Sequence, residues 1–179
     1  MARILITRHG QTKENAEGVV QGKEHGNINQ KGFEQIKKLI KILKKQNLNK
    51  IISSDIPRCS ITAKEIEKKI SVPVEYTNLI REKDNGELIG KNHKEFNWDD
   101  LKGTFETRKA PNGENLEEVR ERGRKFFKEL KRNYKDFDGT ILIVSHGSRV
   151  FMTVSFVTRK NYLTSESTLK ITHCGGSLR

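Results

Sequence analysis

Two short apolar runs, far apart in the chain, each end at a histidine that is followed by glycine. Residues 4–7 lead into Arg8-His9-Gly10, and residues 141–144 lead into Ser145-His146-Gly147. Loops that follow parallel strands meet at one edge of the sheet, and this edge is where α/β folds bind ligands. Because glycine has no side chain, it also lets the backbone approach a ligand closely. We therefore expect His9 and His146 to face one bound molecule.

Strand and helix patterns alternate along the whole chain. The apolar runs predict strands at Arg3–Thr7, Lys50–Ser53, Val72–Tyr76, Thr140–Ser145 and Leu169–Thr172. Amphipathic spacing predicts helices after Asn29, from Pro57, after Asn115 and through Val150 and Phe156. The apolar face expected for the first of these helices comprises Phe33, Ile36, Leu39, Ile40 and Leu43. This alternation predicts an α/β fold, in which a parallel sheet carries helices on both faces.

The length of 179 residues favours a single domain that covers residues 1–179 and has its own core. Within it, the stretch from Lys83 to Gly113 is polar and rich in glycine. We expect this stretch to form a long excursion over one edge of the sheet. Excursions of this length usually act as lids or walls of functional sites.

The net charge of +12 raises the question of an anionic partner. Much of the positive charge is interleaved with glutamate at helical spacing, as in residues 64–69 and 117–122, which is typical of solvated helix faces. Aromatic residues do not alternate with the basic ones, as stacking on nucleic-acid bases would require. We therefore do not expect nucleic acid as a partner, and from the charge alone we expect at most a modest attraction of anionic substrates by the positive field.

Composition excludes further classes of protein. No apolar stretch is long enough to span a bilayer, and the chain begins with a strand rather than a targeting segment. The two cysteines, Cys59 and Cys174, make neither a disulfide framework nor a metal-ligand spacing. We expect a cytoplasmic protein without membrane attachment, in which both thiols are ordinary residues.

The residues near the two histidines suit phosphoryl transfer. A neutral imidazole such as that of His9 can attack phosphorus and form a phosphohistidine. The oxygens of the transferred group need positive charge, and Arg8 and Arg58 can supply it, since guanidinium pairs with phosphate in a bidentate manner. A protonated His146 and the amide of Asn15 would add two further donors.

The leaving oxygen needs a proton, which a carboxylic acid can supply. Glu82 follows Arg81 at the start of the excursion and is expected to fill this role, and then to deprotonate the attacking water. The alternatives nearby in the sequence are Glu75, Asp84 and Glu87. The remaining histidines, for which no chemistry is expected, are His25, His93 and His173.

A series of motifs extends through nearly the whole chain. They are Arg8-His9-Gly10-Gln11-Thr12 with Asn15, Gln21-Gly22, Ser53–Arg58, Arg81-Glu82, Gly113-Glu114 and Ser145-His146-Gly147. In this order, they make the chain resemble the phosphatase branch of the histidine phosphatase superfamily, the phosphoglycerate-mutase-like proteins. The resemblance implies a three-layer α/β/α sandwich with a mostly parallel central sheet, a phosphohistidine on His9, and no metal or cofactor. The site residues it implies are catalytic Arg8, His9, Arg58, Glu82 and His146, and substrate-binding Asn15, Gln21, Gly22 and Gly147.

The resulting hypothesis is metal-independent hydrolysis of phosphomonoesters. The alternative is a phosphoglycerate mutase that uses the same site. A mutase must keep its bisphosphate intermediate from water and generally adds sequence around the site, whereas the excursion at 83–113 is modest in length. An inactive phosphate-binding or basic interaction protein is a third reading, and the presence of all the expected catalytic residues disfavours it.

Residues 169–172 alternate apolar and polar side chains, as an outer strand does, and little sequence follows them. An uncovered strand edge presents unpaired backbone groups and invites pairing with another chain. We therefore expect a homodimer formed through this edge or through the neighbouring helix.

Overall fold

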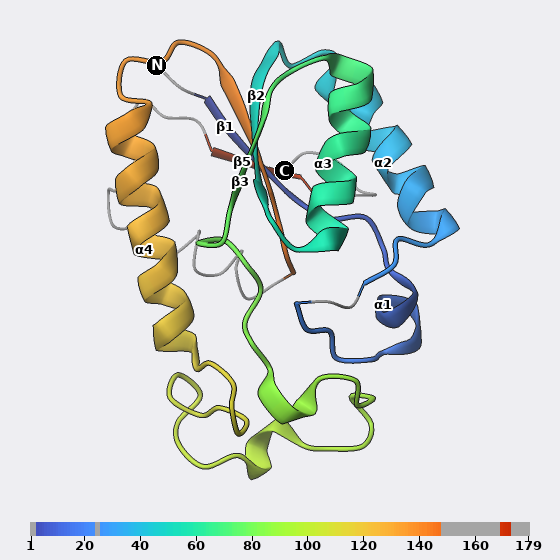
Figure 1. The fold of residues 1–179 in the computed structure, drawn as a ribbon, viewed down its shortest axis with the longest axis vertical. Coiled ribbons are helices and arrows are strands. Elements are labelled where there is room, and N and C mark those ends of the chain that lie inside the picture. Colours follow the sequence, from blue (N-terminus) through green and yellow to red (C-terminus); the bar gives the residue numbers. More distant parts are fainter. Residues whose placement is uncertain (1–2, 24–25, 148–168, 173–179) are drawn as a thin grey trace.

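The computed structural model describes residues 3–23, 26–147 and 169–172, and these residues form a central parallel sheet (Figure 1). The strands lie in the order β3-β2-β4-β1-β5, and each neighbouring pair is parallel. Their bounds are β1 Arg3–Arg8, β2 Leu48–Ser54, β3 Val74–Thr77, β4 Thr140–Ser145 and β5 Leu169–Thr172. The five predicted strands are therefore confirmed. β3 begins at Val74 rather than Val72, since the intervening Pro73 has no N–H for the ladder.

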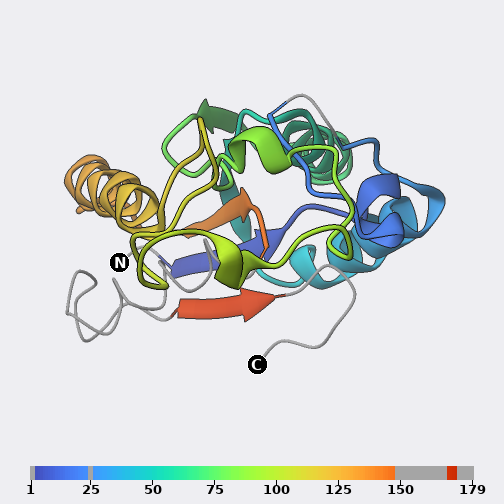
Figure 2. The ribbon, with the colours of Figure 1, turned by 90° about the horizontal axis from the view of Figure 1, so that it is seen from below.

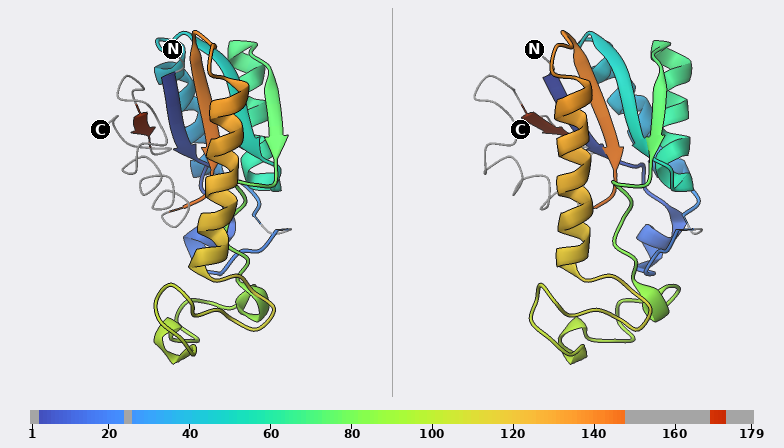
Figure 3. Two further views of the ribbon diagram at one scale, coloured as in Figure 1. Left: turned by 90° about the vertical axis from the view of Figure 1, so that its left-hand side faces the viewer. Right: turned by 60° about the vertical axis from the view of Figure 1, so that its left-hand side comes forward.

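Helices cover both faces of the sheet, as Figures 2 and 3 show. On one face lie α2 (Gln30–Leu43) and α3 (Pro57–Ile70), and on the other lies α4 (Leu116–Asn133). This arrangement confirms the predicted three-layer α/β/α sandwich. The helix that was expected through Val150 and Phe156 lies outside the described residues. Of the helices in the described ranges, none combines the length and the apolar character that crossing a membrane requires.

The central strands are apolar on both faces because both faces are covered. Successive side chains of a strand point to opposite faces. Ile4 and Ile6 of β1 therefore pack with Phe126 and Phe127 of α4, while Leu5 packs with the side chains of α2 and α3. This is why the first and fourth strands are uninterrupted apolar runs rather than alternating ones.

The first turn of α2 differs from the expected apolar face. Ile36, Leu39, Ile40 and Leu43 are buried as predicted, but Phe33 is 39% exposed. The buried position in that turn is Gly32 instead, because a side chain there would collide with the backbone of Gln11: an added Cβ would lie 2.2 Å from its carbonyl oxygen. The helix approaches the loop after β1 through this glycine.

The segment between β3 and α4 forms the predicted excursion, which extends beyond the carboxyl ends of the strands (Figure 1). It contains two short 3₁₀ turns, Gly86–Leu88 and Trp98–Asp100. Leu88, Trp98 and other apolar residues of the excursion pack around Val20, a residue of the loop after β1. A short helix that the sequence did not predict, α1 (Lys13–Glu17), also lies in that loop.

Candidate active site

The parallel pairing of β1 with β4 brings the two predicted histidines together. Arg8 is the register partner of Ser145, so His9 and His146 follow neighbouring strand ends. The backbone N–H of His9 donates to the Ser145 carbonyl at 3.0 Å, and the two imidazole ring centres lie 5.5 Å apart. Both rings are buried. The two histidines therefore lie close together, as expected from their places at the two strand ends.

Backbone contacts determine which nitrogen of His9 can react. Its Nδ1 lies 2.7 Å from the Gly10 carbonyl oxygen, and a carbonyl oxygen can only accept a hydrogen bond. Nδ1 therefore carries the proton in a neutral ring, and Nε2 keeps its lone pair. Burial, followed by the positive charge of Arg58, lowers the pKa of His9 to about 3. His9 is accordingly neutral at pH 7, as expected.

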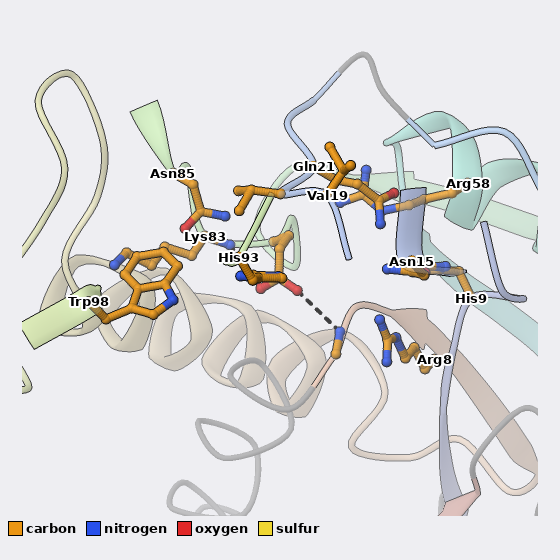
Figure 4. A pocket seen from close by; sticks show the side chains of 13 residues that line it. Arg8, His9, Asn15, Val19, Gln21, Arg58, Lys83, Asn85, His93 and Trp98 are labelled. Atoms are coloured by element: carbon orange, nitrogen blue, oxygen red, sulfur yellow. Dashed lines mark hydrogen bonds between the residues drawn. The ribbon is translucent and has the colours of Figure 1, made fainter. Parts of the chain in front are cut away.

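A cavity of about 300 Å³ opens over His9. Most of the predicted site residues line it, namely Arg8, His9, Asn15, Gln21, Arg58, Glu82 and Gly147. The sequence did not single out the other lining residues, which are Val19, Val20, Lys83, Asn85, His93 and Trp98. Figure 4 shows the cationic and histidine side chains of Arg8, His9 and Arg58 on one side of the cavity, with Asn85 and Trp98 on the other. The arginines therefore gather with His9 at one end of the cavity, while the other end combines the Trp98 ring with the Lys83 ammonium group, which lies 5.3 Å from the ring centroid.

Two loop contacts orient the end of the cavity where the arginines lie. Arg58, in the first turn of α3, is only 1% exposed and donates from Nη1 to the Gly22 carbonyl at 2.9 Å. Gly22 itself does not line the cavity, and its carbonyl group contributes to the site by holding the Arg58 guanidinium group. The side-chain oxygen of Asn15 faces the N–H of Thr12 at 3.4 Å in a capping box, which leaves the amide NH₂ as a donor for the cavity.

Glu82 is held by two backbone donors. Its Oε1 accepts from the N–H of Lys83 at 3.0 Å, and its Oε2 accepts from the N–H of Gly147 at 3.2 Å, the bond drawn as the dashed line in Figure 4. The second bond links the carboxylate to the loop that carries His146. None of the three alternative carboxylates, Glu75, Asp84 and Glu87, lines the cavity. The structure therefore favours Glu82 among the four candidates.

His146 lies deeper than the sequence suggested. Its ring is 0% exposed and lies outside the cavity wall, with Nε2 at 2.8 Å from the Ser54 hydroxyl and 3.4 Å from the Cys59 sulfur. Burial, and then the charge of Arg58, hold the pKa of His146 well below its usual value. A protonated His146 was expected as a donor to the phosphate, but this ring is neutral because water cannot solvate its charge once it is buried.

His93 was expected to carry no chemistry, yet it lines the cavity. Long-range backbone bonds place it there: its N–H donates to the Gly18 carbonyl at 2.9 Å, and the N–H of Val20 donates to the Lys91 carbonyl at 2.9 Å. These bonds join the loop after β1 to the excursion. A sequence pattern cannot reveal such a pairing, although the excursion as a whole was expected to form a wall.

The described residues contain no group of three or more His, Cys, Asp or Glu side chains that could hold a metal ion. The two other histidines that the sequence analysis set aside, His25 and His173, lie outside the described residues.

Comparison with known proteins places these features in a family. The model of the histidine phosphatase superfamily (branch 1) matches residues 4–165. The "Probable phosphatase C1687.21" of Schizosaccharomyces pombe is 29% identical over 94% of this chain and 79% of its own length. The "Probable phosphoglycerate mutase GpmB" of Escherichia coli O1:K1 is 30% identical over 68% of this chain and 60% of its own length.

Among solved structures, Bacillus stearothermophilus YhfR shares the fold, with a TM-score of 0.79 and 23% identity over 94% of this chain and 87% of that one. The family model covers most of the chain and includes both strand-end histidines, Arg58 and Glu82. This chain therefore belongs to the histidine phosphatase superfamily, branch 1.

Proposed function

We propose that this chain hydrolyses small phosphomonoesters through a phosphohistidine on His9. The observation that carries the proposal is the state of His9, whose buried, neutral ring is fixed through Nδ1–H to Gly10. Its remaining lone pair, on Nε2, belongs to a ring that lines a cavity shared with Arg8 and Arg58. A nucleophile without charge beside two guanidinium groups suits attack on an anionic phosphate.

In the first step, Nε2 of His9 forms a bond to phosphorus while the bond from phosphorus to the ester oxygen breaks. The leaving oxygen takes a proton from the Glu82 carboxyl group and departs as an alcohol. The charge on the transferred oxygens is balanced by Arg8 and Arg58, which act as fixed electrostatic donors. Asn15 adds a neutral donor on the same side of the cavity.

In the second step, the Glu82 carboxylate accepts a proton from water, and the water oxygen attacks the phosphohistidine. The bond between Nε2 and phosphorus breaks, and inorganic phosphate leaves. His9 returns to its neutral form, and Glu82 is again protonated. One acidic side chain thus serves both steps, first as acid and then as base.

The mutase alternative is not favoured. The match to a phosphatase of Schizosaccharomyces pombe spans more of this chain than the match to a mutase of Escherichia coli. The excursion at residues 83–113 is also modest in length, whereas a mutase generally adds sequence around the site to keep its bisphosphate intermediate from water.

The phosphohistidine can be tested by trapping. Wild-type protein mixed with ³²P-labelled substrate and quenched should carry a label that acid removes and alkali preserves. His9→Ala should carry none and should lose nearly all turnover, while its circular dichroism stays native. His93→Ala, a histidine at the rim of the same cavity, is the matched control and should still be labelled. A label that resists acid, on serine for example, would contradict the mechanism.

We further propose that no metal takes part. The positive charge that phosphoryl transfer needs is provided by Arg8 and Arg58, which line the cavity themselves. Activity should therefore survive dialysis against EDTA. Loss of activity on chelation, restored by added magnesium, would show that a metal supplies charge at the phosphate instead. The cytoplasmic location and the homodimer remain proposals that rest on the sequence alone.

A further inference from the structure

The segment that carries Glu82 is fixed by one side chain of α4. Arg122 donates from Nη1 to the carbonyl oxygens of Leu79 at 3.1 Å and Arg81 at 3.2 Å, and from Nη2 to that of Glu82 at 3.4 Å. The carbonyl between them, that of Ile80, accepts from the Ser145 hydroxyl at 2.9 Å. Four successive carbonyl groups of a segment outside the sheet are thus satisfied by side chains of other elements.

Glu114 holds Arg122 in this position. Its two carboxylate oxygens accept from Nε and Nη2 of Arg122 at 2.9 and 2.8 Å, a bidentate pair. Glu114 also binds the far side of the Glu82 segment, because its Oε2 accepts from the N–H of Asp84 at 2.9 Å, and its own N–H donates to the Asp84 carbonyl at 2.8 Å. Both side chains are about three-quarters covered, at 24% and 27% exposure.

We propose that Arg122, held by Glu114, is a positioning residue for the proton donor Glu82. This inference rests on the proposed function, since it assumes that Glu82 protonates the leaving group. Neither Arg122 nor Glu114 lines the cavity, so neither touches the substrate. Together they fix the backbone on both sides of Glu82, and with it the direction in which the carboxylate leaves the chain.

A purely structural role would have a different signature. If the ion pair only tied α4 to the excursion, its loss would lower the melting temperature and leave the reaction of folded molecules unchanged. If it positions Glu82, its loss should affect the substrates that need protonation most. Alkyl phosphates have poor leaving groups and depend on the acid, whereas p-nitrophenyl phosphate has a good one and depends on it little.

The test is a double-mutant cycle of Arg122→Met and Glu82→Gln, assayed with glycerol 2-phosphate and p-nitrophenyl phosphate. We expect Arg122→Met to lower kcat for the alkyl ester by about 10- to 100-fold, the scale of a displaced catalytic group, with a much smaller loss for the nitrophenyl ester. In the Glu82→Gln background, Arg122→Met should lower kcat for the alkyl ester little further, because the proton that Arg122 helps to place is already absent. Arg124→Met is the matched control and should match wild type, since Arg124 lies on the same helix and forms an exposed ion pair with Glu121 at 3.0 Å.

Arg122→Lys and Glu114→Gln keep the size of each side chain, and they carry the test if Arg122→Met does not fold. Both should show the same loss specific to the alkyl ester, in a milder form, at temperatures well below their melting points. Equal losses for the two esters, or losses in the cycle that multiply, would overturn the positioning role while leaving the function of Glu82 intact. A Glu82→Gln variant with normal kcat for the alkyl ester would overturn both this inference and the proposed acid.

Discussion

Beneath the cavity, the thiol of Cys59 is buried against the backbone and the inner histidine. It is 0% exposed, its sulfur lies 3.3 Å from the Ser145 carbonyl oxygen, and His146 is its neighbour on the other side. Burial raises the pKa of the Cys59 thiol well above its usual value. A thiol that cannot ionise and cannot be reached is not a nucleophile, so Cys59 serves as a packing residue that supports His146.

We predict that Cys59 in the native protein resists alkylation. Iodoacetamide reacts with the thiolate. The raised pKa keeps Cys59 as a thiol, and burial keeps the reagent away from its sulfur. After treatment at pH 8, peptide mapping should find Cys59 unmodified and phosphatase activity retained. In 6 M guanidinium chloride, the same peptide should become alkylated. Modification of Cys59 in the folded protein at a rate similar to that in denaturant would contradict the packing shown here.

Single residues of the site were predictable to different degrees. His9, Arg58 and Glu82 occur in motifs whose local sequence indicates their chemistry, and all three line the cavity. The neutrality of His146 could not be predicted, because it depends on burial by residues that are distant in sequence. The same holds for His93, whose place at the cavity results from backbone bonds between the loop after β1 and the excursion.

At the level of elements, α2 approaches the nucleophile loop unusually closely. The space at Gly10 is bounded by the Gly32 carbonyl oxygen, which would lie 2.9 Å from an added Cβ. Gly32 in turn faces the backbone of Gln11. The N–H of Gln11 also donates to the side-chain oxygen of Gln35, a residue of α2, at 2.9 Å. The two glycines let the first turn of the helix support the backbone directly after His9.

We predict that Gly32→Ala destabilises the protein, although alanine favours helices. The new methyl group would lie 2.2 Å from the Gln11 carbonyl oxygen, and a backbone atom cannot move aside cheaply. Overpacking of this kind typically costs about 1–3 kcal/mol, measurable by urea unfolding. Lys31→Ala, the exposed neighbour in the same turn, should change the free energy of unfolding by less than about 0.5 kcal/mol. Equal stability of the two variants would show that α2 can shift away from the loop.

Strands and long helices were predictable because their patterns are local. The helix starts at Asn29 and Asn115 are confirmed, since each side chain accepts from a backbone N–H of its first turn. The five-residue α1 carries no apolar periodicity, and its capping box at Thr12 forms only in the context of the site loop. The shift of Phe33 out of the core follows from a tertiary contact at Gly32, which the periodicity of α2 does not encode.

For the whole molecule, the two buried histidines link stability to pH. Both are neutral in the folded chain, and burial is the first cause of the lowered pKa in each. In the unfolded chain, each would bind a proton near its usual pKa of about 6.5. Below that pH the unfolded state binds more protons than the folded state, so the free energy of unfolding must fall as the pH is lowered.

We predict that His9 alone contributes about 2 kcal/mol to the stability lost between pH 7 and pH 5. The loss begins near pH 6.5, the pKa of about 6.5 in the unfolded chain. It continues until about pH 3, because the pKa of His9 in the folded chain is about 3. Urea unfolding of wild type and of His9→Asn at both pH values measures the effect, because the asparagine cannot take up the proton. The variant should lose less stability than wild type over this interval. His93→Asn, which removes an exposed histidine, should follow wild type. Parallel losses in wild type and His9→Asn would mean that His9 accepts its proton in the folded chain, and the neutral nucleophile proposed for catalysis would then be wrong.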